Sequence, residues 1–189
     1  KETLKEGVKD ATALVSLLST NVDKDVIDSG KNLKIITNYG AGFNNVDVDY
    51  AREKDIDVTN TPKASTNATA DLTIGLILSV ARRIVEGDEL SRTKGFDGWA
   101  PLFFRGREVS GKTIGIIGLG EIGGAVAKRA RAFDMDVLYS GPHRKEEKER
   151  EIGAKYVDLD TLLENADFIT INAAYNPDLH HLIDSEQFK

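Results

Sequence analysis

Apolar runs of strand length alternate along the chain with amphipathic segments of helical period. In the first third, strands are predicted over residues 13–18, 33–37 and 56–59, with helices near 22–29 and 48–54 between them. A later series predicts strands over 113–117, 136–140, 155–157 and 168–172, with helices over 121–133, 144–152 and 159–165. Strands that alternate with helices are typical of βαβ units. The sequence therefore predicts an α/β protein with parallel sheets.

Two segments connect these series. Residues 66–92 have one long helical pattern, which we interpret as a bridge between domains, and residues 95–110 form an irregular aromatic loop. We predict two parallel-sheet units of Rossmann or flavodoxin type joined by a long helix. We expect the first unit over residues 1–65, the connecting helix over 66–94, the aromatic loop over 95–110 and the second unit over 111–189. Both units are expected to be truncated, because the chain starts without Met and residues 185–189 look like the first turn of a helix.

Composition excludes several classes of protein. The 189 residues include no cysteine, which rules out a disulfide scaffold and Cys-ligated zinc. A net charge of −6 without a basic, aromatic-rich stretch argues against nucleic-acid binding. Residues 72–81 are apolar over only about ten positions, too few to span a membrane. With no secretion signal and no metal-ligand spacing, we expect a cytoplasmic, metal-free protein with a small-molecule partner.

The strongest motif is a glycine turn between the predicted strand at 113–117 and the helix that follows. Gly118 permits a tight turn, Gly120 allows close approach of a pyrophosphate, and Gly123 lets the helix pack on the strand. The helix N-terminus would present free N–H groups to the phosphates. Residues 106–113 also fit a P-loop pattern, but they enter a strand instead of a helix, so we interpret that match as coincidence.

The expected tip of the strand at 136–140 lacks the carboxylate that holds the ribose 2′-hydroxyl of NAD. Ser140 and Gly141 stand there, followed by His143, Arg144 and Lys145. Cationic side chains with no carboxylate beside them favour binding of NADPH, through its 2′-phosphate, over binding of NADH. A solvated basic start of a helix would have the same pattern. NADPH is the predicted cofactor, with NADH as the alternative.

A second glycine loop, residues 40–45, follows the predicted strand at 33–37. It lacks a third glycine, which makes it a poor pyrophosphate site. Its backbone N–H groups could hold an anion, and a purely structural role is equally open.

Four segments in order resemble the D-isomer-specific 2-hydroxyacid dehydrogenase family, and within it the glyoxylate/hydroxypyruvate reductases. They are NYGAGFNNVDVDYAREKDIDVTNTP, ATADLTIGLILSVARR, GWAPLFFRG and GKTIGIIGLGEIGGAVAKRA. The resemblance implies a substrate domain over 1–65 and a cofactor domain over 111–189, with a dimerisation segment over 95–110.

The resemblance also implies roles for individual residues. Ala41 and Gly42 would bind the substrate carboxylate, and Trp99 would reach the active site of the other subunit of a homodimer. The cofactor-binding positions implied are Thr69, Gly118, Gly120, Glu121, Ile122, Gly123, Ser140, Gly141, His143, Arg144, Lys145, Ala173 and Ala174. The family's catalytic Arg, Glu and His are expected after Lys189, so no catalytic residue is assigned in this chain.

The implied reaction is reduction of a small 2-oxo acid, glyoxylate or hydroxypyruvate, by hydride transfer from NADPH. Two alternatives stay open. One is an NAD-linked phosphoglycerate or D-lactate dehydrogenase, and the other is a non-enzymatic NAD(P) sensor similar to the corepressors that share this fold.

Overall fold

The computed structural model describes residues 1–93, 95 and 98–188. The chain divides into two compact units. The first contains residues 1–65 and the segment Tyr175–Leu179, which includes a short 3₁₀ turn at Pro177–Leu179. The second contains residues 66–174 and the segment from His180 onward.

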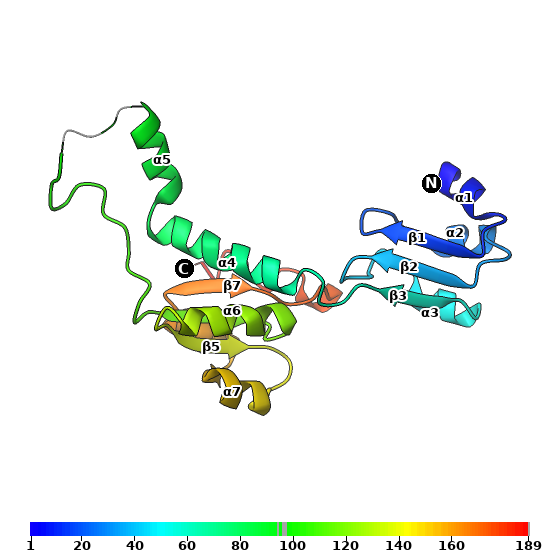
Figure 1. The fold of residues 1–189 in the computed structure, drawn as a ribbon. Helices are drawn as coiled ribbons and strands as arrows, with labels where there is room; N and C mark the ends of the chain where they lie inside the picture. The colour runs from blue at the N-terminus through cyan, green and yellow to red at the C-terminus, as the bar shows by residue number, and fades with distance from the viewer. Residues whose placement is uncertain (94, 96–97, 189) are drawn as a thin grey trace. The chain divides into compact units, whose positions relative to one another are not determined.

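The first unit is a three-stranded parallel sheet with helices on one face (Figure 1). Its elements are α1 (Glu2–Val8), β1 (Ala13–Leu17), α2 (Lys24–Ser29), β2 (Ile35–Tyr39), α3 (Val48–Glu53) and β3 (Asp57–Asn60), with the strands in the order β1-β2-β3. Asp23 and Asp47 cap α2 and α3 by accepting backbone N–H groups through their side chains. Val26, Ile36 and Ala51 are fully buried where the helices meet the sheet.

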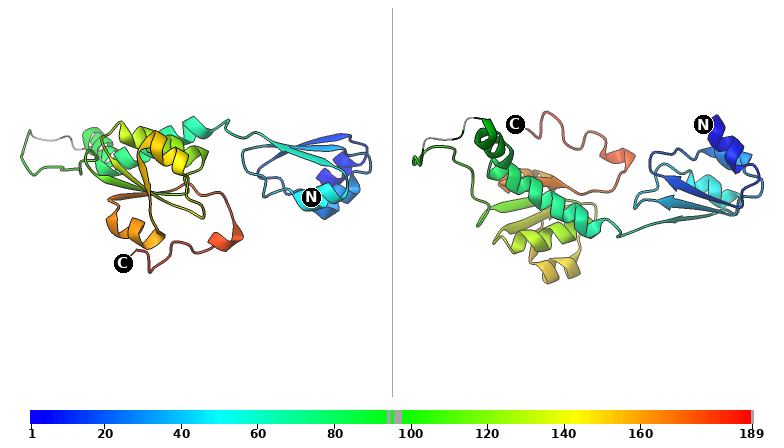
Figure 2. Two further views of the ribbon diagram at one scale, coloured as in Figure 1. Left: turned by 90° about the horizontal axis from the view of Figure 1, so that it is seen from below. Right: turned by 45° about the horizontal axis from the view of Figure 1, so that its top comes forward.

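The second unit is a four-stranded parallel sheet covered on both faces (Figure 2). Its elements are α4 (Thr66–Ala81), α5 (Ile84–Thr93), β4 (Thr113–Ile117), α6 (Glu121–Arg131), β5 (Asp136–Ser140), α7 (Glu146–Ile152), β6 (Ala154–Tyr156), α8 (Leu159–Asn165) and β7 (Phe168–Ile171). The strand order is β6-β5-β4-β7. On β4, Ile116 packs against α6, and the adjacent Gly115 lies against Leu162 of α8 on the opposite face.

The predicted α/β architecture with two parallel sheets is confirmed, and each predicted strand lies within two residues of the observed one. Of the predicted irregular loop over 95–110, residues 98–110 contain no helix or strand, and residues 96 and 97 lie outside the described residues. The short helix α1 was not predicted. Its seven residues bury only Val8, which leaves no apolar period to detect.

The prediction of one continuous helix over residues 66–92 is wrong. The helix ends at Ala81, and Arg83 has a left-handed backbone with φ of 55°. The N–H group of Arg107 donates to the carbonyl of Ala81 at 2.6 Å, and the Arg83 guanidinium lies 4.3 Å from the centre of the Phe104 ring. The backbone of the aromatic loop therefore hydrogen-bonds to the last carbonyl group of α4, and α5 runs in a new direction (Figure 1).

The predicted helical turn at the end of the chain is also not observed. Residues 185–188 form a turn in which the Asp184 side chain accepts the N–H of Glu186, and Gln187 accepts the N–H of Asp184. Lys189 lies outside the described residues.

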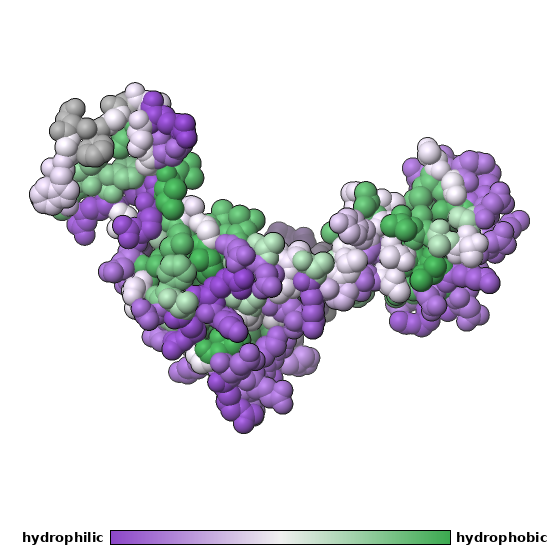
Figure 3. Space-filling model, viewed as in Figure 1, coloured by the Kyte–Doolittle hydropathy of each residue, from purple (hydrophilic) through white to green (hydrophobic). Residues whose placement is uncertain are grey.

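Apolar side chains stay exposed on the side of α4 that lines a pocket beside β7, and at the start of α5. Leu72, Leu76 and Val80 of α4 and Val85 of α5 are all more than half exposed, and Figure 3 shows this apolar surface. No helix in the described part of the chain is long and apolar enough to cross a membrane.

Candidate functional site

The glycine turn lies directly after β4, between the ends of its two neighbouring strands. The N–H of Gly118 donates to the carbonyl of Ser140 on β5 at 2.8 Å, and the N–H of Asn172 donates to the carbonyl of Ile117 at 2.8 Å. Gly118 has φ of +95°, and a Cβ atom there would lie 2.7 Å from the backbone nitrogen of Ala173. Only glycine fits this position without strain.

The other two glycines have different surroundings. A Cβ on Gly123 would lie 2.1 Å from the carbonyl oxygen of Gly118, so Gly123 allows α6 to start against the turn. A Cβ on Gly120 would meet no atom within 4 Å. The backbone is thus tightly packed on one side of the turn and open on the other, which is the geometry that a pyrophosphate requires.

α6 begins at Glu121, and its N-cap residue Gly120 has no side chain that could satisfy the first N–H groups. These groups and the positive end of the helix dipole favour an anion. Ile122, the second residue of α6, packs against the buried core of the unit.

Lys148 of α7 supports the turn from outside the motif. Its Nζ donates to the carbonyl of Gly120 at 3.1 Å and lies 3.2 Å from Oε1 of Glu121. Sequence reasoning missed this residue, because it comes 28 positions after Gly120 and belongs to another helix.

Helix α4 brings Thr69 to the same edge of the sheet. α4 is tied to α6 by Arg129, whose Nε donates to Oδ1 of Asp71 at 2.6 Å. Thr69 and Asn172, the residue after β7, line one pocket of about 630 Å³. Thr69, Gly118 and Ala173 therefore lie around the carboxyl ends of β4 and β7, where open α/β sheets bind ligands.

The tip of β5 carries no carboxylate, as predicted. A Cβ on Gly141 would meet nothing within 4 Å, and the Gly141 carbonyl accepts the hydroxyl of Tyr156 at 3.0 Å. Ser140 is buried, and His143 and Lys145 are exposed.

Arg144 is held in an ion pair that the sequence did not predict. Its Nε and Nη2 donate to the two carboxylate oxygens of Glu149 on α7, each at 2.9 Å. The Tyr139 hydroxyl also donates to Glu149, at 2.7 Å. Arg144 foremost, and then Tyr139, hold the pKa of the Glu149 carboxyl below its usual value, and burial raises the pKa of Tyr139. At neutral pH the carboxylate is therefore charged and the phenol protonated.

The first unit's glycine loop is fixed by buried amide side chains. The Asn38 side chain is fully buried and donates to the Gly42 carbonyl at 2.8 Å and to Oδ1 of Asn45 at 2.9 Å. Ser16 donates to Asn38 at 2.8 Å, and Asn60 donates to the Ala41 carbonyl at 2.8 Å.

These bonds leave one side of the loop open. Within the described residues, the N–H groups of Ala41 and Gly42 have no hydrogen-bond partner. They are therefore available to an anion, as the loop interpretation requires.

Trp99 lies in the irregular loop with 85% of its surface exposed, and Leu102 of the same loop is also exposed. Phe104, in contrast, packs against Gly87 of α5. Nothing within the described chain covers the Trp99 side chain.

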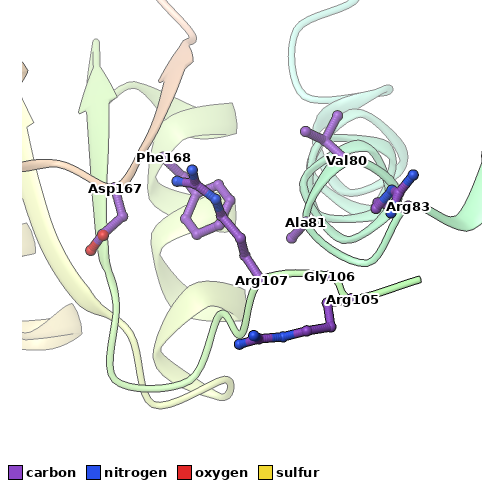
Figure 4. A pocket seen from close by; sticks show the side chains of 8 residues that line it. All are labelled: Val80, Ala81, Arg83, Arg105, Gly106, Arg107, Asp167 and Phe168. Atoms are coloured by element: carbon purple, nitrogen blue, oxygen red, sulfur yellow. The ribbon is translucent and has the colours of Figure 1, made fainter. Parts of the chain in front are cut away.

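A further pocket, of about 560 Å³, lies between the end of α4, the loop at Arg105–Arg107 and the start of β7. Three arginines line it, but Figure 4 shows Arg83, Arg105 and Arg107 pointing in different directions. It also lies at the amino end of β7, opposite the glycine turn. The arginine side chains therefore do not converge on one ligand position, and we do not regard this pocket as the functional site.

The described residues contain no cluster of three or more His, Cys, Asp or Glu that could hold a metal ion.

Residues 74–189 match the sequence profile of the D-isomer specific 2-hydroxyacid dehydrogenase, NAD binding domain. The chain belongs to this family. It is 88% identical over its whole length to a provisionally named 2-hydroxyacid dehydrogenase of Staphylococcus aureus strain MRSA252, of which it covers 60%. The chain thus spans about 60% of the length of the curated relatives it matches.

Solved structures from the 2-hydroxyacid dehydrogenase family share the fold. A glyoxylate reductase from Paecilomyes thermophila superposes with a TM-score of 0.84 at 35% identity, over 98% of this chain and 58% of that one. A D-lactate dehydrogenase from Aquifex aeolicus, complexed with NAD and lactic acid, superposes with a TM-score of 0.87 at 29% identity, over 97% and 54%. Since both substrate types are represented, the comparison leaves the subtype within the family unresolved.

The residues predicted to bind the cofactor all belong to the second unit. Thr69, the turn from Gly118 to Gly123, and Ala173 lie around the carboxyl ends of β4 and β7, and Ser140 with Gly141 ends the adjacent β5. Ala174 is exposed and follows Ala173. Ala41 and Gly42 belong to the first unit.

Proposed function

We propose that the full-length protein containing this chain is a cytoplasmic reductase that converts a small 2-oxo acid, glyoxylate or hydroxypyruvate, to the D-2-hydroxy acid with NADPH. The observation that carries this proposal is the glycine turn after β4, closed behind Gly123 and open over Gly120. Family membership supports it. The catalytic Arg, Glu and His are proposed to lie in the part of the relatives' length that this chain does not span.

Each part of the chain has a proposed task in this reaction. The N–H groups at the start of α6 hold the pyrophosphate, and Thr69 lies beside the nicotinamide. The N–H groups of Ala41 and Gly42 hold the substrate carboxylate. NADPH, when bound, supplies the hydride for the carbonyl carbon.

The preference for NADPH rests on the charges near the tip of β5. The carboxylate of Glu149 bonds to Tyr139 of β5 and is also bound by Arg144. It is therefore not free to take ribose hydroxyls. Hydrogen-bond donors for a 2′-phosphate are provided by the side chains of Arg144, Lys145 and His143.

Gly141→Asp tests this preference. The open space at Gly141 accepts a side chain, and a carboxylate there would bind ribose hydroxyls and repel a 2′-phosphate. We expect the ratio of kcat/KM for NADPH to that for NADH to fall by about tenfold or more, as like charges in contact cost over 1 kcal/mol. Comparable kcat/KM values for the two cofactors in the unaltered protein would contradict the proposal.

Turnover separates the reductase from a nucleotide sensor. With glyoxylate or hydroxypyruvate, the full-length protein should consume NADPH, followed by loss of its near-ultraviolet absorbance. Binding of NADPH without consumption in the presence of either acid would favour the sensor.

An NAD-linked D-lactate dehydrogenase is the second candidate, because a relative of this type binds NAD and lactic acid in the same fold. Assays that pair pyruvate with NADH and glyoxylate with NADPH distinguish the two. Faster turnover of pyruvate with NADH would favour the second candidate.

We also propose that the protein forms a homodimer. Trp99 and Leu102 are exposed in the aromatic loop, and Ile84 and Val85 at the start of α5 are also more than half exposed (Figure 3). Apolar patches of this kind mark interfaces. Light scattering of the full-length protein should give twice the mass of one chain.

A further inference from the structure

The ion pair between Arg144 and Glu149 is asymmetric in its exposure. The Arg144 side chain is 58% exposed, whereas that of Glu149 is 13% exposed. The two parallel hydrogen bonds, each 2.9 Å long, join Nε and Nη2 to the two carboxylate oxygens. The carboxylate is thus the fixed partner, and the guanidinium is held at the surface.

Tyr139 fixes this carboxylate from the interior. Tyr139 lies on β5 with 1% of its surface exposed, and its hydroxyl donates to Oε1 of Glu149 at 2.7 Å. The same hydroxyl accepts the N–H of Lys145 at 2.7 Å. Its ring packs against Tyr156, whose hydroxyl bonds to the Gly141 carbonyl. The chain after β5 and the Glu149 carboxylate are therefore tied to one buried side chain.

This arrangement leaves part of the guanidinium available. Of its five N–H donors, Glu149 takes one on Nε and one on Nη2. The whole Nη1 group and the second N–H of Nη2 point away from the carboxylate. A planar guanidinium with a free edge can bind a phosphate through two parallel hydrogen bonds.

We propose that Glu149 and Tyr139 are positioning residues that hold Arg144 with its free edge ready for the 2′-phosphate of NADPH. This inference rests on the proposed function of the site. A flexible arginine would lose conformational freedom when the phosphate binds, whereas an arginine already held by Glu149 has lost it beforehand. The selectivity for NADPH would then depend on the fixed conformation of the Arg144 side chain as well as on its charge.

Binding of nucleotide fragments tests the positioning role without turnover. The full-length protein is titrated calorimetrically with adenosine 2′,5′-bisphosphate and with adenosine 5′-monophosphate. Glu149→Gln and Tyr139→Phe should each weaken binding of the bisphosphate by about threefold to tenfold, the cost of ordering one long side chain. Binding of the monophosphate should not change. Glu147→Gln, an exposed residue on the same helix, removes the same charge and should change neither affinity.

The possible results lead to separate conclusions. If Glu149→Gln and Tyr139→Phe bind the bisphosphate as tightly as the unaltered protein, or more tightly, the positioning role is wrong. If the unaltered protein binds both nucleotides equally, the NADPH preference in the proposed function is wrong, and the inference with it. Thermal unfolding of each variant is measured in parallel, and Tyr139→Phe, which keeps the buried ring, decides the question if Glu149→Gln does not fold.

Discussion

Asn38 shows how one buried side chain can determine the shape of a binding loop. Its amide accepts a hydrogen bond from Ser16 and donates to Gly42 and Asn45, and the whole side chain is buried. The loop carbonyls are therefore turned toward the interior, which leaves the N–H groups of Ala41 and Gly42 for a ligand.

Asn38→Ala should lower the free energy of unfolding by about 2 kcal/mol, because the Gly42 carbonyl and the Ser16 hydroxyl lose their buried partner. Urea denaturation measures this change. Asn44→Ala, an exposed neighbour in the same loop, should stay within about 0.5 kcal/mol of the unaltered protein. Equal effects of the two substitutions would contradict the role given to Asn38.

The pair of Arg144 and Glu149 predicts a dependence of stability on acidity. Because Arg144 lowers the pKa of Glu149 in the folded protein, the pair stabilises the fold above the ordinary carboxyl pKa and loses this effect as the pH falls through the lowered value. Glu149→Gln should therefore be less stable than the unaltered protein at pH near 7, with the difference shrinking below pH about 4. Thermal unfolding across this range measures it, and a difference that grows toward acid would contradict the ion pair.

For single residues, the sequence predicted the geometry of the glycine turn but not the contacts made by distant side chains. The three glycines of the turn could be assigned because strand, turn and helix are contiguous in the chain. Lys148, Glu149 and Asn38 could not, because each depends on packing between elements that are distant in sequence.

Among the elements, α6 offers a matched pair of glycines. A Cβ on Gly123 would collide with the carbonyl oxygen of Gly118, whereas one on Gly124 would meet its nearest atom, Nζ of Lys148, at 3.6 Å. Both lie in the same helix, so only their surroundings differ.

Gly123→Ala should destabilise the fold by about 3 kcal/mol or more, because backbone must move to admit the methyl group. Gly124→Ala should stabilise it by about 0.5 to 1 kcal/mol, because alanine favours the helix. Chemical denaturation of the two variants provides the comparison. A tolerated alanine at Gly123 would show that the turn and helix are not packed as described.

Element boundaries were predictable where the apolar pattern stops with the element. β5 and α8 have the predicted bounds. The break between α4 and α5 was missed because apolar residues continue through Val80, Ile84 and Val85. The break depends on contacts with Arg107 and Phe104, which a local pattern does not contain.

Across the whole molecule, the alternation of strands and helices was sufficient to predict two parallel-sheet units. Parallel sheets normally have both faces covered. In the first unit, Val15, Leu17 and Tyr39 lie on the face without helices and are more than half exposed. Within the described residues, this face of the first sheet is therefore apolar and uncovered.

The proposed cofactor site places a dinucleotide over Gly120. Gly120→Thr tests this most directly, because the site is open and threonine caps a helix about as well as glycine. The decisive measurement is a calorimetric titration of the full-length variant with NADPH, with thermal unfolding as the control for folding. We predict an unchanged melting temperature and loss of measurable NADPH binding. A folded variant that binds NADPH with the affinity of the unaltered protein would contradict the assignment of the site.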